Sequence, residues 1–150
     1  MEHHATTSLN QQAFSATVHC LTGCAIGEVL GLVIATALGW HDLPSVVLAI
    51  VLAFVFGYAL TIRSLRASGV PYRRAGRLAA ASDTLSIVTM EIVDTAIVLA
   101  IPGAMAAGLL TGLFWGSLAF SLIVAGIVAF PVNRWLIARG KGHAVLHEVH

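Results

Sequence analysis

The sequence predicts an all-α integral membrane protein, a four-helix bundle with both termini in the cytoplasm. Of its 150 residues, 58% are hydrophobic and only 10% are charged, and the mean hydropathy is +0.90. Soluble domains average about 25% charged residues, so a soluble globular domain of this composition could not cover its surface. The composition also excludes a disordered chain, and two cysteines are too few for a disulfide scaffold. A net charge of +1 provides no basic surface for nucleic acid.

Four apolar runs are long enough to cross a bilayer as helices, which takes about 20 residues each. They cover residues 14–38, 43–62, 78–101 and 113–133, and residues 134–150 follow as a tail. Gly39 marks a helix end after the first run, and Asp42 is a candidate N-cap for the second. The runs fill most of the chain, so we expect a single membrane domain.

All eight basic residues lie on one side of this predicted bundle. Five arginines lie between the second and third spans, and Arg134, Arg139 and Lys141 follow the fourth. The other two connections and the N-terminal tail contain none. Cytoplasmic loops carry an excess of Lys and Arg, so both termini and the central connection are expected in the cytoplasm. The expected location is the cytoplasmic (inner) membrane, crossed several times.

The first span carries a row of side chains that could bind a ligand. Cys20, Cys24 and Glu28 are spaced i, i+4 and i+8, so they lie on one face of the helix. His19 lies at the edge of the same face.

The third span carries a second row. Asp83, Met90 and Asp94 are spaced i, i+7 and i+11, with Glu91 beside them. The first and third spans run in the same direction, and each residue advances a helix by about 1.5 Å. Counted from the cytoplasmic ends, the two rows reach matching depths, so we expect them to face each other level by level.

The four acids in these rows need a neutralising partner. A charged side chain at the centre of a bilayer costs about 2.5–3.5 kcal/mol on insertion scales. The span cores contain no Lys or Arg, and His19 is the one basic side chain available. The acids must therefore be protonated, bind a cation or lie in a water-filled cavity.

The other residue types in the rows suggest which cation. Thiols, imidazole and thioether favour Cu(I) or Zn(II), whereas carboxylates favour harder ions such as Fe(II). We therefore expect a transition-metal ion (copper, zinc or iron) between the first and third spans, held at a single mixed site or at a soft and a hard site along a path. The candidate ligands are His19, Cys20, Cys24, Glu28, Asp83, Met90, Glu91 and Asp94. Five histidines in the tails could collect metal at the surface: His3, His4, His143, His147 and His150.

Several stretches resemble a bacterial family of four-helix membrane domains described as a domain of unknown function. They are TGCAIGEVLG at 22–31, FGYALTIRSL at 56–65, DTLSIVTMEIVDTAIVL at 83–99 and FWGSLAFSLIVAGIVAFPVNRWLIARGKGH at 114–143. The resemblance covers most of the chain from about residue 19 onward and implies a bacterial origin. It brings no established activity, but the family is associated with copper-handling proteins. The resemblance therefore adds to the case for a metal.

Three other functions stay open. The protein could be a proton or cation pathway through Glu28, Glu91 and Asp94 in which the thiols have no role. It could be a non-catalytic partner subunit of a larger membrane complex. A redox enzyme using Cys20 and Cys24 is less favoured because their helical spacing is awkward for a disulfide, and we do not expect an enzyme. Such a small chain suggests a homo-oligomer or a membrane partner protein.

Some of these residues also have a purely structural interpretation. Cys20, Cys24 and Met90 are ordinary core residues in many proteins. A stripe of small residues in the first span predicts a helix-packing surface, which could also serve a homo-oligomer: Gly23, Gly27, Gly31 and Ala35. Ser117 and Ser121 in the fourth span are interpreted as bonding back to their own helix.

Overall fold

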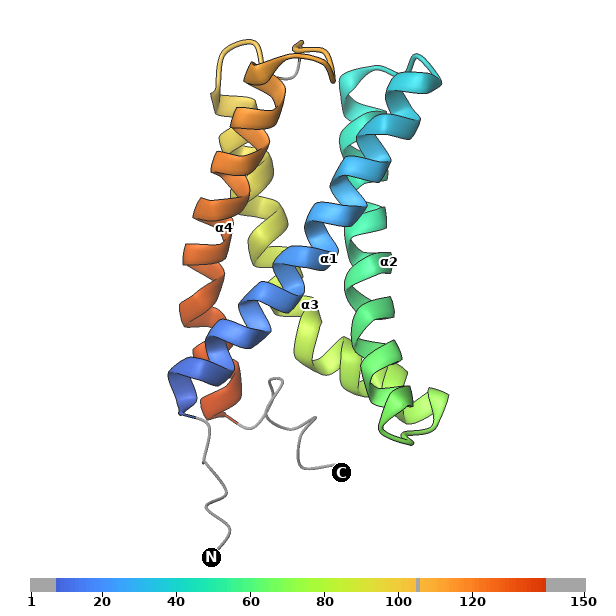
Figure 1. Cartoon of the computed structure of the whole chain (residues 1–150), viewed down its shortest axis with the longest axis vertical. Helices are drawn as coiled ribbons and strands as arrows, with labels where there is room; N and C mark the ends of the chain where they lie inside the picture. Colours follow the sequence, from blue (N-terminus) through green and yellow to red (C-terminus); the bar gives the residue numbers. More distant parts are fainter. Residues whose placement is uncertain (1–7, 105, 140–150) are drawn as a thin grey trace, which may run out of the picture.

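The computed structural model describes residues 8–104 and 106–139, and this part of the chain forms four helices and no strand (Figure 1). The helices are α1 (Leu9–Ala37), α2 (Asp42–Ala67), α3 (Tyr72–Ala100) and α4 (Gly112–Ala138). The five tail histidines lie outside the described residues, so the metal-collecting role expected of them stays a prediction.

The prediction of an all-α membrane bundle is confirmed. Three helices, α1, α2 and α4, are long and apolar enough to cross a membrane. α3 is as long as α1, but it contains three acids and three arginines and is less apolar. The helices extend beyond the predicted spans at the start of α1 and α3 and at the end of α2 and α4. These four extensions lie at the same end of the bundle (Figure 1).

The helix ends follow local chemistry. Ser8 begins α1 with a capping box, in which its hydroxyl accepts from Gln11 N–H and the Gln11 side chain accepts from Ser8 N–H. The expectation that Asp42 caps α2 is wrong, because His41 occupies the N-cap and Asp42 is the first helical residue. Its negative charge there still favours the helix N-terminus. Gly39 after α1 has φ +67°, which a residue without Cβ adopts at little cost.

α1 packs most closely against α2, and α3 packs most closely against α4, so the chain forms two helical hairpins (Figure 1). Each helix also contacts its other neighbour, whereas α1 and α3 lie diagonally across the bundle. The faces of α1 and α3 that point inward therefore meet at the bundle axis. The side chains on these two faces fill the interior.

The glycine stripe of α1 is the contact with α2. A Cβ at Gly23 would lie 2.8 Å from the Cα of Gly57, and one at Gly27 would overlap the backbone of Ala53. A Cβ at Gly31 would lie 2.6 Å from the Cα of Ala49. The stripe is thus used within one protomer, and it does not offer the oligomer surface that the sequence suggested.

Apolar side chains face outward and polar ones face inward. Phe120, Ile123 and Ile127 of α4 are each more than half exposed, as are Val51 and Val55 of α2. The buried set is rich in alanine, serine and threonine together with several acids. Small residues at the helix contacts and apolar ones outside suit a bundle whose solvent is lipid.

One buried hydrogen bond joins α4 to α1. The Asn133 amide donates to the Thr17 hydroxyl at 3.0 Å, and Thr17 in turn donates to the Ala13 carbonyl. Asn133→Ala is expected to lower the free energy of unfolding by about 1–2 kcal/mol because Thr17 loses this interhelical partner. The check is thermal unfolding in detergent of Asn133→Ala, Thr17→Val and the double variant. Fully additive losses would show that the two side chains are not coupled.

Candidate functional site

The eight residues predicted from the sequence all point into the interior, and they form three groups along the bundle axis. Seven of them are buried, and His19 is partly buried. We call Glu28, Glu91 and Asp94 the carboxyl trio. The sulfur group consists of the two cysteines and Met90, and the remaining pair is His19 with Asp83.

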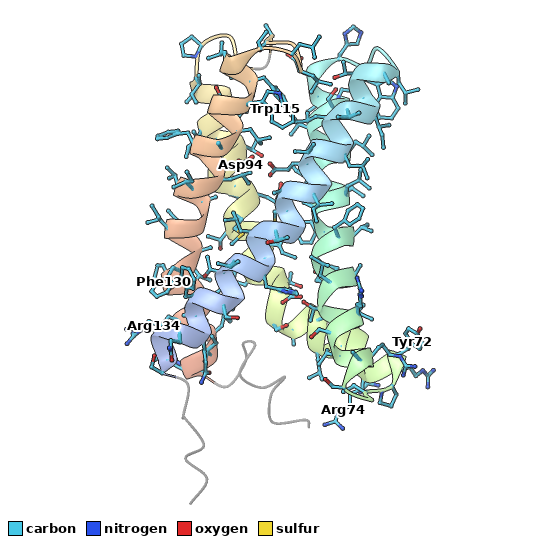
Figure 2. The ribbon with its side chains drawn as sticks, viewed as in Figure 1. Tyr72, Arg74, Asp94, Trp115, Phe130 and Arg134 are labelled. Atoms are coloured by element: carbon cyan, nitrogen blue, oxygen red, sulfur yellow. The ribbon has the colours of Figure 1, made fainter. Side chains whose placement is uncertain are left out.

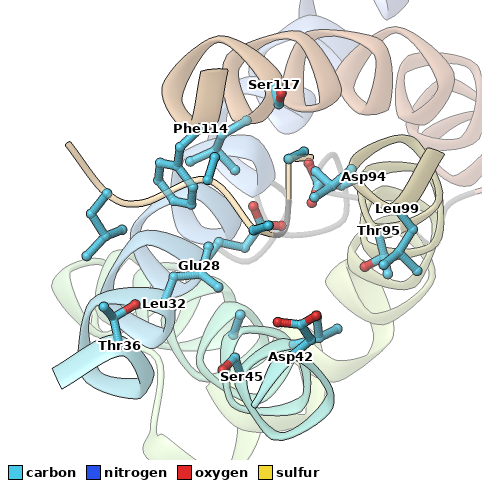
Figure 3. Close-up of a pocket in the computed structure, with 18 of the residues that line it drawn as sticks. Glu28, Leu32, Thr36, Asp42, Ser45, Asp94, Thr95, Leu99, Phe114 and Ser117 are labelled. Carbon is cyan, nitrogen blue, oxygen red and sulfur yellow. The ribbon is translucent and has the colours of Figure 1, made fainter. Parts of the chain in front are cut away.

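The carboxyl trio lies at the inner end of a cavity of about 360 Å³. The cavity is lined by all four helices and by the α3–α4 connection, at the end of the bundle away from the start of α1. Glu28 is the deepest lining residue on α1, and Glu91 is the deepest on α3. Figure 3 shows the side chains of Glu28 and Asp94 reaching into this space from α1 and α3. The trio is therefore the part of the predicted site that the cavity reaches.

The three carboxyl groups contact one another. The Glu28 carboxyl lies beside those of Glu91 and Asp94. Ser121 of α4 donates to the Oδ1 atom of Asp94. Apart from the other carboxyl groups of the trio, no hydrogen-bond donor from the described residues reaches either Glu28 oxygen or the Oε1 atom of Glu91. Glu28 is only 3% exposed, so both oxygens of this buried acid depend on the neighbouring acids or on a ligand for a hydrogen bond.

The sulfur group follows next along the axis. Cys20, Cys24 and Met90 are at most 1% exposed and belong to one buried cluster. The Cys24 thiol contacts the Glu91 carboxyl, which joins the sulfur group to the trio. Both cysteines are free thiols. None of the three residues lines the cavity, and Glu91 lies between Cys24 and that space.

His19 and Asp83 lie beyond the sulfur group, toward the end with the termini. The Nε2 atom of His19 is hydrogen-bonded to the Thr61 hydroxyl at 2.9 Å. The Asp83 carboxyl interacts with the same hydroxyl and with the His19 ring, and it accepts from Ser82 at 3.0 Å. Asp83 also lies near Cys20, so the three groups form a continuous line.

The two rows face each other in the predicted order. Asp83 is near Cys20, Glu91 is near Cys24, and Asp94 is near Glu28. The eight residues nevertheless do not converge on one centre. Within residues 8–104 and 106–139, no three His, Cys, Asp or Glu side chains are grouped so that they could hold a metal ion. The residues of each row are spread along the bundle axis because successive members of a row lie one or two helical turns apart.

Sequence reasoning missed the polar residues that α2 and α4 contribute. The Ser121 hydroxyl bonds back to the Leu118 carbonyl, as expected, and it also reaches Asp94, which the sequence did not predict. Thr61 of α2 connects His19 with Asp83. A single hydroxyl in an apolar helix is too common to predict such a role. The diagonal placement of α1 and α3 explains the roles of Thr61 and Ser121, because α2 and α4 then lie on either side of every contact between the two rows.

Comparisons with known proteins identify a family but no activity. No curated protein and no solved structure gives a significant match to the chain. One family model, described as "Domain of unknown function (DUF4396)", matches residues 9–142. That range includes all four helices and every member of the three groups. The chain therefore belongs to this family of domains of unknown function.

Proposed function

We propose that this membrane protein binds a cation at the carboxyl trio, which the cation reaches through the cavity. The observation that carries the proposal is the state of Glu28. Its carboxyl group is buried, faces the cavity and has no hydrogen-bonding partner among the described residues except the two acids beside it. A bound cation would supply a positive partner, and the three acids, which are not grouped as a metal site in this structure, would have to close around it.

The charge balance supports a cation rather than an anion or a neutral ligand. Three acids meet inside the bundle, and no Lys, Arg or His is among the residues that line the cavity. All seven described arginines lie toward the other end, as Figure 2 shows for Arg74 and Arg134. Ionisable residues inside a membrane mark ion and proton pathways far more often than packing sites. Protons neutralise the trio when no other cation is bound there.

The same arginines support an orientation. With Arg-rich ends in the cytoplasm, both termini lie inside and the cavity opens on the opposite side. Trp40 and Trp115 lie at the cavity end and suit the second membrane interface. We place the protein in a bacterial cytoplasmic membrane, with its carboxyl trio accessible from outside that membrane.

A second candidate is a path for a transition-metal ion, and the sulfur group favours it. Cys24 contacts Glu91, and Cys20 lies between Cys24 and Asp83, so sulfur ligands follow directly after the trio. Thiolates and thioethers prefer copper and zinc. In this version the trio receives the metal, and the sulfur group and the His19–Asp83 pair pass it toward the cytoplasm.

Cation binding by purified protein in lipid nanodiscs tests both candidates. Zn²⁺, Mn²⁺ and Cu⁺ are titrated into wild type, into Glu28→Gln/Glu91→Gln and into Cys20→Ser/Cys24→Ser, and bound ions are measured by elemental analysis. Glu28→Gln/Glu91→Gln is expected to weaken binding at least tenfold because the trio loses two of its three charges. Thr22→Val is the control, since Thr22 is an exposed polar residue of α1 that does not line the cavity.

The cysteine variant separates the candidates. Unchanged binding in Cys20→Ser/Cys24→Ser supports the trio alone, whereas loss of Cu⁺ and Zn²⁺ supports the sulfur path. If none of these ions and no proton exchange with the trio is detected in wild type, the cation proposal is wrong. A protein that then co-purifies with another membrane protein would indicate a partner subunit.

A further inference from the structure

The cavity is much larger than an inorganic ion needs. Its volume of about 360 Å³ falls in the range of sites that hold small organic ligands. A dehydrated metal ion would occupy only the space beside the trio. The remainder lies between the trio and the α3–α4 connection.

The walls of that remaining space are mostly apolar. Leu32 of α1 and Val46 and Ile50 of α2 form one side. Val98 of α3 and Leu118 of α4 lie among the residues that form the other side. Two aromatic residues, Trp40 and Phe114, complete the lining toward the mouth. Apolar and aromatic walls with a few polar groups at one place are typical of small-molecule sites.

The polar groups are acidic and lack donors. Besides the trio, Asp42 at the mouth is the fourth acid of the lining. The two Glu28 oxygens and Glu91 Oε1 are three acceptors that no described residue outside the trio reaches with a donor. A ligand that satisfies them needs a positive charge and N–H groups, and a protonated amine has both. Aromatic rings near the mouth also attract organic cations.

We infer that the cavity binds a protonated primary amine that carries a compact apolar body. The ammonium group lies at the carboxyl trio and donates to Glu28 and Glu91. The apolar body lies between Leu32, Val46 and Leu118. This inference rests on the proposed cation site and names the class of its ligand.

A set of related compounds tests separately how much the positive charge, the N–H donors and the apolar body of the ligand each contribute to binding. The probe is radiolabelled 2-phenylethylammonium, measured by equilibrium dialysis against wild type in nanodiscs, with empty nanodiscs subtracted. The competitors are methylammonium, which lacks the apolar body, the N,N,N-trimethyl derivative, which lacks donors, and neutral 2-phenylethanol. We expect the probe to bind at least tenfold more tightly than each competitor.

Two tryptophan variants test the location. Val46→Trp fills the apolar part of the cavity, and it is expected to weaken probe binding at least tenfold while weakening equilibrium binding of inorganic cations much less. Val47→Trp is the matched control, since Val47 is 51% exposed on the outer face of α2. Glu28→Gln should also weaken probe binding at least tenfold.

The outcomes distinguish this inference from the proposed function. If inorganic cations bind at the trio but the probe does not, the inference is wrong and the cation proposal stands. If 2-phenylethanol binds as well as the probe, the cavity selects apolar ligands and the inference is again wrong. If neither the probe nor any inorganic cation binds, both are wrong.

Discussion

Replacement of Gly27 by leucine is expected to prevent the bundle from assembling. Even a single methyl group at this position would overlap the backbone of Leu52 and Ala53 in α2. Backbone atoms cannot rotate away as side chains do, so α1 and α2 must separate along their whole contact. Inserting even one or two methylenes into a packed core costs about 1–3 kcal/mol, and leucine at a backbone contact exceeds that range. The expected result is aggregated protein in size-exclusion chromatography after detergent extraction.

A control in the same protein makes this result specific. Gly116 lies within α4, and a Cβ there would meet no atom within 4 Å. Gly116→Ala should therefore give a monodisperse protein, with stability unchanged or slightly raised by the better helix former. If Gly27→Leu were also monodisperse and as stable as wild type, the close contact between α1 and α2 would be wrong.

Replacement of Glu28 by methionine is expected to raise stability and abolish cation binding. Methionine resembles glutamate in length but has no acceptor that needs a donor or a charge that needs a partner. The exchange of buried charged groups for apolar ones of similar volume stabilises many proteins by about 1–4 kcal/mol. A gain of that order is expected here because the only described partners of the Glu28 oxygens are two other acids, and methionine removes the repulsion among the three.

Whether the stability of the Glu28 variants rises or falls distinguishes a binding role from a structural one. A residue kept for structure loses stability when replaced, as expected for Asn133, which does have a partner. A residue kept for binding gains stability when replaced and loses its ligand. The measurement is thermal unfolding of Glu28→Met and Glu28→Gln in one detergent, together with the cation titration. Lower stability in both variants with unchanged binding would assign Glu28 a structural role.

The positions of the helices could be predicted because the membrane imposes them. A helix must cover the hydrocarbon thickness, so apolar runs of the right length appear directly in the sequence. The two rows could also be predicted, since spacings of four, seven and eleven residues return to one helix face. Their mutual depth followed from the shared direction of the first and third spans.

The shape of the site could not be predicted. From the sequence, the eight residues could form a single metal site or a soft and a hard site along a path, whereas the structure divides them among three levels and opens the cavity to only one. That division depends on the crossing geometry of four helices, which periodicity does not encode. The contributions of Thr61 and Ser121 depend on the same geometry, because each acts through a residue on another helix.

Because α1 and α3 belong to different hairpins, each of the three groups along the bundle axis is divided between the two hairpins. Glu28 belongs to the first hairpin, whereas Glu91, Asp94 and Ser121 belong to the second. At the other end, Thr61 belongs to the first hairpin and Asp83 to the second. The carboxyl trio and the contact between Thr61 and Asp83 therefore both lie where the two hairpins meet. The glycine contacts between α1 and α2 hold the first hairpin together as one rigid unit. A small rotation of one hairpin against the other would increase the separation between the hairpins at one membrane face and decrease it at the other.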